Sequence, residues 1–385
     1  MRLLAIGVKV ADEGAGMGDG DGRARPLRVL QSVRGPRPTT NPYVVQLMQG
    51  LGEHAEVRAF TWPAALLWRY DVLHVHWPEV VVDRRHPLRR LAAVAALHLV
   101  LVRCRLRRTA VVRTAHNLRP HEEVPDRATG GVLRACDRAT TWWVRLNDGT
   151  PTPGDAPATT VPHGHYVDWF ARHPRRPAEP RRLASVGLLR PYKGIDELLS
   201  AFAALDDPEA SLVVAGRPVT EAIAAQVRTA AAQDGRVVTD LRHVDDADLV
   251  RWITSASLVA LPYRQMHNSG AALLALSLGR PVLVPANPVT DALAAEVGPA
   301  WVRRFTGPLT ADALRTALAD VDGLSDASAP DLSARDWPAG TRAHLEVYRA
   351  AVGRSRRRAA RGTPGRTPEA VRSTVGAGDD TRESA

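Results

Sequence analysis

The stretch VGLLRPYKGID, residues 186–196, indicates the fold class of this chain most directly. An apolar strand pattern ends at Val186, a short loop follows, and a helical pattern begins at Ile195. The start of a helix attracts phosphate because its first N–H groups are unpaired and its dipole is positive there. Arg190 and Lys193 add two positive charges to this loop. The stretch therefore predicts a diphosphate-binding loop at the carboxyl end of a parallel strand.

Lysine is rare in this chain, which makes Lys193 informative. Of the 51 basic residues only Lys9 and Lys193 are lysines, and all the others are arginines. Lysine is a compact point charge on a flexible stem, which suits a single phosphate oxygen. We interpret Lys193 as a phosphate ligand, and the alternative is an ordinary exposed cation in a loop.

A second cluster of polar residues lies in LPYRQMHNSG, residues 261–270, just before a helical pattern. Asn268 or Ser269 is a favourable N-cap for that helix, and Gly270 lets a ligand approach the backbone closely. Capping alone explains such a sequence. The other interpretation is a second anion-binding helix start that faces the first.

Strands and helices alternate on both sides of these loops. Strands are expected at 27–33, 57–61, 71–76 and 110–114 before a Pro- and Gly-rich break at 149–182, and at 182–186, 211–215, 236–239, 258–261 and 281–285 after it. Such alternation predicts an α/β chain with two doubly wound parallel sheets. Because these sheets bind ligands at the carboxyl ends of their strands, two facing sheets would form a central cleft.

The order and spacing of these segments resemble the GT-B glycosyltransferases, and within them a bacterial polysaccharide-type branch of glycosyltransferase family 4. The resemblance rests on the two loops above and on NPY at 41–43, DVLHVHWPE at 71–79, TAHNLRPHE at 114–122 and VPHGHY at 161–166. It implies two Rossmann-like domains facing a central cleft. The implied division is an N-terminal extension 1–26, an acceptor domain 27–165, a donor domain 166–335, a returning helix 336–352 and a disordered basic tail 353–385.

The resemblance implies transfer of a hexose-type sugar from a nucleotide-diphosphate sugar to a hydroxyl of a lipid-linked or polysaccharide acceptor. It assigns the donor diphosphate to Arg190 and Lys193, and the second helix start, with Asn268, Ser269 and Gly270, is a further candidate for binding it. Since the protein supplies the cations, no metal and no cofactor other than the nucleotide sugar is expected.

The acceptor-side segments supply the candidate catalytic residues. His116 matches the place of a family histidine that lies near the reacting sugar, and Glu122 and Glu79 are alternative general bases. Asn117 and His163 are expected to line the cleft or contact the acceptor.

Two glutamates that the family usually carries are missing, because their places hold Met266 and Leu274. A retaining or an inverting outcome therefore stays open. The alternatives to the transferase are a catalytically inactive GT-B scaffold and a related sugar-nucleotide enzyme.

The formal charge of +10 is concentrated in residues 84–108 and in the tail 353–385. The apolar middle of 84–108 is too short to span a bilayer, which takes about 20 residues. The segment is therefore either a buried helix with charged ends or a helix docked on an anionic membrane surface. We expect a cytoplasmic protein, with docking on the inner face of the cell membrane as the second possibility. No groove-reading motif accompanies the charge, so a nucleic-acid partner is not expected.

Overall fold

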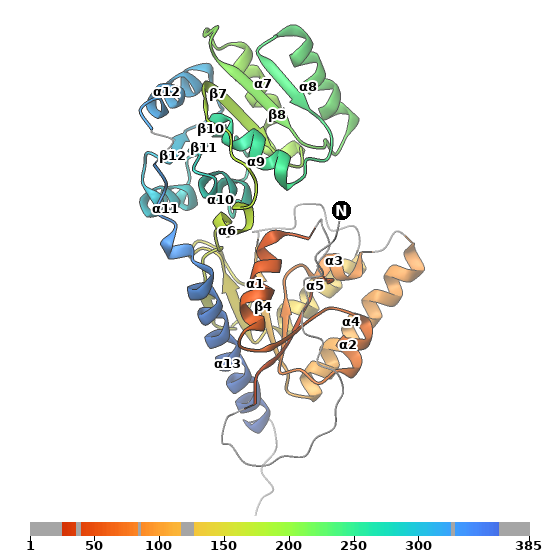
Figure 1. Cartoon of the computed structure of the whole chain (residues 1–385). Helices are drawn as coiled ribbons and strands as arrows, with labels where there is room; N and C mark the ends of the chain where they lie inside the picture. Colours follow the sequence, from red (N-terminus) through yellow and green to blue (C-terminus); the bar gives the residue numbers. More distant parts are fainter. Residues whose placement is uncertain (1–24, 36–39, 84–85, 117–126, 325–327, 362–385) are drawn as a thin grey trace, which may run out of the picture.

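The computed structural model describes residues 25–35, 40–83, 86–116, 127–324 and 328–361. Two lobes, each built on a parallel sheet, meet near α6 (Val167–Phe170), and the last helix returns along the first lobe (Figure 1). Two candidate site residues, Asn117 and Glu122, lie outside the described residues, and so do nearly all of the predicted N-terminal extension and most of the predicted tail.

The N-terminal lobe contains a six-stranded sheet in the order β2-β1-β3-β4-β5-β6, in which all neighbouring strands are parallel. In chain order the strands are β1 (Arg28–Gln31), β2 (Glu56–Ala59), β3 (Val72–Val75), β4 (Ala110–Ala115), β5 (Trp142–Arg145) and β6 (Ala158–Thr160). Alternate residues of each strand face opposite sides of the sheet. Val29, Val72 and Val112 pack on one side, whereas Leu30 and Leu73 pack on the other.

Different helices cover the two sides of this sheet. The side of Val112 is covered by α1 (Pro42–Gly52) and α13 (Trp337–Arg361). The other side is covered by α2 (Trp62–Leu67), α3 (Pro78–Val82), α4 (Pro87–Leu106) and α5 (Arg127–Ala139). Helices on both faces of a parallel sheet make the doubly wound arrangement that the sequence predicts.

The C-terminal lobe repeats the architecture with the strand order β12-β11-β10-β7-β8-β9. Its strands are β7 (Glu179–Val186), β8 (Ser211–Ala215), β9 (Val237–Asp240), β10 (Ala256–Ala260), β11 (Val282–Pro285) and β12 (Val302–Phe305). Its helices are α7 (Ile195–Ala203), α8 (Glu221–Gln233), α9 (Asp246–Thr254), α10 (Gly270–Ser277), α11 (Pro288–Val297) and α12 (Ala311–Val321). The prediction of two Rossmann-like sheets is confirmed.

Helix α13 carries the chain back from the second lobe onto the first. Its first residue, Trp337, donates from Nε1 to the carbonyl of His165 at 2.8 Å and covers Gly164, where any Cβ would collide with the indole ring. Farther along, α13 packs against α1, β4 and β5.

The expected end of this last helix at Val352 is wrong, because α13 continues to Arg361. After Gly353 the sequence is rich in arginine and alanine and has no proline or further glycine before Gly362. Arginine and alanine favour the helix, so nothing in the sequence ends it at Val352.

Helix α4 is buried along one face only. Val94, Leu97 and Leu101 pack on the sheet, whereas the opposite face exposes a row of large apolar side chains. That row consists of Leu88, Leu91, Leu99, Val102 and Leu106, each between 52% and 77% exposed. Among the described residues, none of the helices has the length and apolar character that crossing a bilayer requires.

Candidate active site

The carboxyl ends of β1, β3 and β4 bring polar side chains onto the side of the sheet that α13 covers. His74 and His76 share this side because they are two residues apart on one extended segment, and Thr114 and His116 share it for the same reason. Of these histidines the family resemblance gives a catalytic role to His116, and the structure places it at the half-buried end of a polar cluster.

Three of these side chains form a continuous hydrogen-bonded row. The Nε2 atom of His116 lies 3.0 Å from Nδ1 of His76, and Nε2 of His76 lies 2.9 Å from the amide oxygen of Gln31. Gln31 is fully buried and His76 nearly so. A buried glutamine whose amide is paired holds its neighbours in one orientation, because losing the bond would leave a polar atom unsatisfied.

The row continues from Gln31 to helix α13 and back to β4. The amide nitrogen of Gln31 donates to the Tyr348 hydroxyl at 3.2 Å, and that hydroxyl lies 2.7 Å from Nδ1 of His74. The other ring nitrogen of His74 lies 2.7 Å from the Thr114 hydroxyl. We call Thr114, His74, Tyr348, Gln31, His76 and His116 the histidine chain.

Burial keeps the histidines of this cluster neutral. It lowers the pKa of His76 to about 3 and holds the pKa of His74 and of His116 well below the usual histidine range. His344 of α13 lies beside the chain, and burial lowers its pKa to about 4. At neutral pH the imidazole of His116 therefore has a free lone pair, as a general base requires.

The ring of His116 is also fixed by neighbouring residues that do not belong to the histidine chain. It stacks on Trp77 with ring centroids 4.1 Å apart, and the ring of Tyr43 meets it edge-on at 5.7 Å. The residue is half-buried. A ring held on its face and edge loses little further freedom when a substrate hydroxyl binds to it.

Asn268 joins the two lobes at this point. Its amide nitrogen donates to the backbone carbonyl of His116 at 2.7 Å, and its oxygen accepts from the Asn147 amide at 2.7 Å. The adjacent His267 lies 2.7 Å from the Thr150 hydroxyl. The Asn268 side chain thus connects the second lobe to His116, and its contact with a donor diphosphate stays a prediction.

Ser269 and Gly270 begin α10 as the sequence predicts. The Ser269 hydroxyl accepts from the N–H of Ala272 at 3.2 Å and caps the helix. A Cβ on Gly270 would lie 3.3 Å from the Tyr166 hydroxyl, so the glycine allows the crossover segment to approach. Both residues thus have structural roles, and their contact with a diphosphate stays a prediction.

Lys193 lies in a loop shaped by two glycines. Gly187 and Gly194 have positive φ angles of 115° and 64°, and any Cβ on Gly194 would collide with the carbonyl of Pro262. The loop is therefore pressed against the residues that follow β10. At Gly194 only glycine allows both the positive φ angle and the close approach of Pro262, and the sequence alone does not reveal this contact.

The Lys193 amine lies near one aromatic ring and one other cation. Its Nζ lies 5.3 Å from the centre of the Tyr263 ring, and burial together with the charge of Arg190 lowers the pKa of Lys193 to about 8. Within the described residues no carboxylate is among the groups that shift this pKa. A partly desolvated ammonium gains stability when an anionic ligand binds beside it.

Glu79 lies in the first turn of α3, and its role as a general base stays a prediction. Burial raises the pKa of Glu79 and the charge of Arg113 opposes that rise, which places the carboxyl near Arg113. Arg113 pairs with Asp137 of α5 on the other side of the sheet, because residues 113 and 114 of β4 point in opposite directions.

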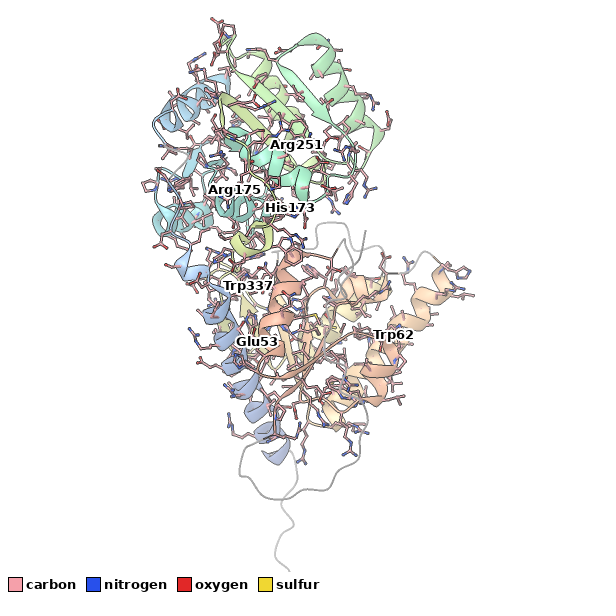
Figure 2. The ribbon with its side chains drawn as sticks, in the orientation of Figure 1. Glu53, Trp62, His173, Arg175, Arg251 and Trp337 are labelled. Carbon is pink, nitrogen blue, oxygen red and sulfur yellow. The ribbon has the colours of Figure 1, made fainter. Side chains whose placement is uncertain are left out.

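His163 packs against Tyr43, the same residue that meets the His116 ring edge-on. Its ring packs 4.4 Å from that of Tyr43, and its Nδ1 lies 2.8 Å from the carbonyl of Gly164. Trp337, which covers this glycine, is labelled where α13 leaves the second lobe (Figure 2).

The two positions where the family usually has glutamates hold apolar residues, and these residues pack among other apolar side chains. Met266 is buried, and its carbonyl accepts from the Asn287 amide at 3.1 Å. Leu274 packs against the core of the second lobe. The two residues therefore bring no carboxylate to the junction of the lobes.

Sequence reasoning missed Gln31, Tyr348 and His344. Gln31 is separated from Tyr348 by 317 positions, and no periodicity connects them. The one available signal was the alternation of His74 and His76 on a strand. Among the described residues, no group of three or more His, Cys, Asp or Glu side chains is arranged to hold a metal ion.

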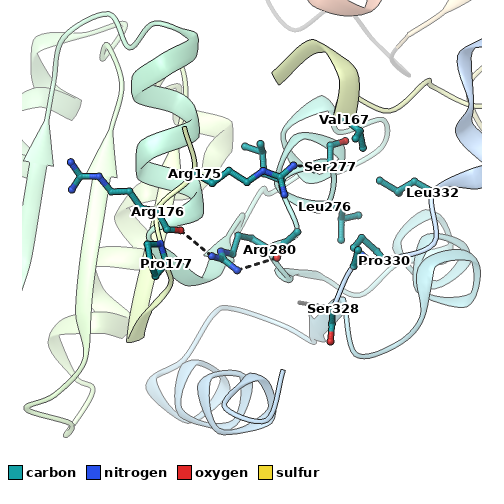
Figure 3. A pocket seen from close by; sticks show the side chains of 13 residues that line it. Val167, Arg175, Arg176, Pro177, Leu276, Ser277, Arg280, Ser328, Pro330 and Leu332 are labelled. Carbon is teal, nitrogen blue, oxygen red and sulfur yellow. Dashed lines mark hydrogen bonds between the residues drawn. The ribbon is translucent and has the colours of Figure 1, made fainter. Parts of the chain in front are cut away.

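A hollow of about 430 Å³ lies elsewhere on the second lobe, at the far end of α10 (Figure 3). Arg280 lines it, but its guanidinium donates to the carbonyls of Thr254, at 2.6 Å, and of Arg176, at 3.3 Å. These bonds hold the backbone around the helix end. The hollow lies away from Ser269 and Lys193, so it is not the candidate active site.

Comparison with known proteins yields matches over most of the chain. Residues 180–320 match the family described as glycosyl transferases group 1. A GDP-mannose:glycolipid 4-beta-D-mannosyltransferase of Xanthomonas campestris pv. campestris is 44% identical over 329 residues, which are 85% of this chain and 93% of the relative.

Solved structures resemble the fold at low sequence identity. Anabaena HepE in complex with UDP superposes with a TM-score of 0.54 at 12% identity and covers 87% of this chain and 99% of its own. The sucrose-phosphate synthase of Thermosynechococcus elongatus gives a TM-score of 0.55 at 16% identity, over 88% and 99% of the two chains.

Proposed function

The chain belongs to the group 1 glycosyl transferases, and from that membership we propose that it transfers mannose from GDP-mannose to the 4-hydroxyl of a sugar in a glycolipid. It is a glycosyltransferase of the GT-B fold that moves a hexose-type sugar from a nucleotide sugar to an acceptor hydroxyl. The observation that carries the finer proposal is the 44% identity to a mannosyltransferase over nearly the whole length of both chains.

The proposed linkage fixes the stereochemistry. GDP-mannose carries its sugar as the α anomer, so a β product requires inversion at C1 by a single displacement. Such a displacement needs one general base for the acceptor hydroxyl and no enzyme nucleophile. The apolar side chains of Met266 and Leu274 are compatible with this reaction, and His116 supplies a neutral imidazole.

Lys193 and Arg190 are proposed to neutralise the charge that develops on the departing diphosphate. Lys193 is well suited because it is a partly buried cation whose pKa is lowered by desolvation and by Arg190. Charge complementarity in a site of low dielectric stabilises the transition state more than the ground state, since the leaving group gains negative charge as the C1–O bond breaks.

A donor screen tests the proposal. Purified enzyme is incubated with radiolabelled GDP-mannose, GDP-glucose, UDP-glucose or UDP-galactose and with glycolipid extracted from the producing cells. We expect label in the lipid fraction from GDP-mannose alone, released by β-mannosidase and not by α-mannosidase. Transfer from a uridine donor, or release by α-mannosidase, would contradict the proposed donor or linkage.

The exposed row of α4 is proposed to dock on the inner face of the cell membrane. Leu88, Leu91, Leu99, Val102 and Leu106 lie on one side of the helix, and the exposed Arg89 and Arg105 stand next to them. Each leucine buried among acyl chains contributes about 1.5–3 kcal/mol, and each arginine near anionic lipid about 1 kcal/mol. Apolar residues flanked by arginines are typical of a helix that lies in a membrane interface.

Liposome flotation tests this docking surface. The triple variant Leu88→Ser, Leu91→Ser, Leu99→Ser is expected to lose at least about ten-fold in binding to vesicles of phosphatidylglycerol and phosphatidylethanolamine. Val219→Ser, which changes an exposed apolar residue of the second lobe, is the matched control and should bind as the wild type does. Equal flotation of the triple variant and the control would refute docking through α4.

A further inference from the structure

The Gln31 amide sets the direction of the hydrogen bonds that lead to His116. Its nitrogen donates to the Tyr348 hydroxyl, so its oxygen is the atom that faces Nε2 of His76. An amide oxygen can only accept, and Nε2 of His76 must therefore carry the proton. Gln31 is fully buried, so no water competes for either end of the amide.

The same reasoning extends to the next ring. His76 is neutral, since burial lowers its pKa to about 3, and with its proton on Nε2 its Nδ1 has the lone pair. That lone pair can accept only a proton held by His116 on Nε2, 3.0 Å away. A neutral His116 with its proton on Nε2 has its own lone pair on Nδ1. Among the described residues, Nδ1 of His116 has no hydrogen-bond partner.

We propose that Gln31 and His76 are positioning residues that hold His116 as the Nε2–H tautomer, so that Nδ1 is the atom that takes the proton of the acceptor hydroxyl. This role rests on the proposed function of His116 as the general base. It also gives the last helix a part in the reaction, because Tyr348 of α13 fixes the orientation of Gln31.

The proton balance is complete with the groups named. As the acceptor oxygen bonds to C1, its proton moves to Nδ1 of His116, and the electron pair of the breaking C1–O bond leaves with GDP. His116 becomes an imidazolium whose Nε2–H still faces Nδ1 of His76. The Gln31 amide does not take up a proton, so the positive charge is confined to His116 and His76 until Nδ1 of His116 releases the proton to water.

The groups around His116 make it a weak base that is seldom protonated. Burial is the main cause of its low pKa, and His76 of β3, His163 of the crossover, His344 of α13 and Arg113 of β4 lower it further. Tyr43 of α1 meets the ring without charge, since burial raises the pKa of its own hydroxyl. The acid limb of the kcat profile should therefore lie below pH 6.5, the usual histidine pKa.

Two substitutions at Gln31 test the positioning role. Gln31→Leu removes the acceptor for His76 and is expected to lower kcat by about 10- to 100-fold with an unchanged donor KM, because His116 loses its fixed orientation. Gln31→Glu retains an acceptor for Nε2 of His76 and adds negative charge. It should recover part of the rate and move the acid limb of kcat upward by about one pH unit.

The matched control is Gln46→Leu, which replaces another buried glutamine of the same lobe, one whose amide nitrogen has no partner in the described part of the chain. It should keep the wild-type kcat and the wild-type pH profile. If the two Gln31 variants lose kcat equally and the acid limb of their kcat profiles stays at the wild-type pH, Gln31 has only a structural role and the proposal is overturned.

Nitrogen-15 NMR of histidine-labelled enzyme checks the tautomer without any turnover. The signals that disappear in His116→Gln should show a protonated Nε2 and an unprotonated Nδ1, and a protonated Nδ1 would overturn the proposal. Transfer that survives in His116→Gln would instead refute the general base. Loss of transfer in His116→Gln together with unaltered profiles in both Gln31 variants would refute the positioning role alone.

Discussion

Replacing Lys193 by alanine is expected to lower kcat/KM for sugar transfer by at least about 10³-fold. The ammonium is the partly buried cation proposed to meet the departing diphosphate, and its loss would remove a charge-assisted hydrogen bond to that group. The binding of GDP, measured by calorimetry, should weaken as well, because the product carries the same diphosphate. Rates and GDP affinities of purified Lys193→Ala and wild type decide the matter.

Two control variants separate the effect of the Lys193 charge from the effects of its shape and of its position in the fold. Lys193→Arg keeps the charge but brings a larger planar head to a loop where a Cβ on Gly187 would already lie 3.3 Å from Nζ, so it should restore only part of the activity. Arg228→Ala removes an exposed cation of α8 that pairs with Glu221 and should have no effect. Wild-type transfer by Lys193→Ala would remove the proposed diphosphate site.

The pKa of Lys193 also predicts a basic limb in the pH profile of kcat/KM. Because burial and Arg190 lower the pKa of Lys193 to about 8, the free enzyme carries the ammonium below that pH and loses it above. The kcat/KM of the wild type should therefore fall as the pH rises beyond about 8, and Lys193→Arg should not show this fall because the guanidinium stays charged.

Replacing His116 by glutamine is expected to lower kcat by about 10²- to 10⁴-fold, the range by which general bases accelerate reactions. GDP affinity should stay within about two-fold of the wild type, because no contact of His116 with the nucleotide is proposed, and its ring lies on the N-terminal lobe. This pattern is the opposite of that for Lys193, in which binding and catalysis fail together. Steady-state kinetics and GDP calorimetry on the purified variant distinguish the two patterns.

The control for His116 is an exposed histidine of the same lobe. His54 follows α1 at the surface, and His54→Ala should leave kcat unchanged. An active His116→Gln enzyme would assign the proton transfer to another group, and Glu122, which lies outside the described residues, would be the next to test.

The fold was largely readable from the sequence, because alternation of strand and helix patterns is local. The loop 186–196 joins β7 to α7 as predicted. The end of α13 was predicted too early, because the residues after Val352 still favour a helix although the packed part of the helix ends near there. The identity as a GT-B glycosyltransferase, which the resemblance implied, is confirmed. The role of Glu79 as an alternative general base stays a prediction, because the charge of Arg113, which acts on Glu79, also acts on His116.

The sequence by itself determined the two doubly wound lobes, the lysine in the loop after β7 and the histidine after β4. Only the tertiary structure decided the state of that histidine. The pKa and tautomer of an imidazole depend on burial and on the partners of its two nitrogens. Here those partners come from β1, β3 and α13, and the decisive pair, Gln31 and Tyr348, is 317 positions apart. Spacing along the chain does not encode such a contact, which exists only after both elements have packed on the same side of the sheet.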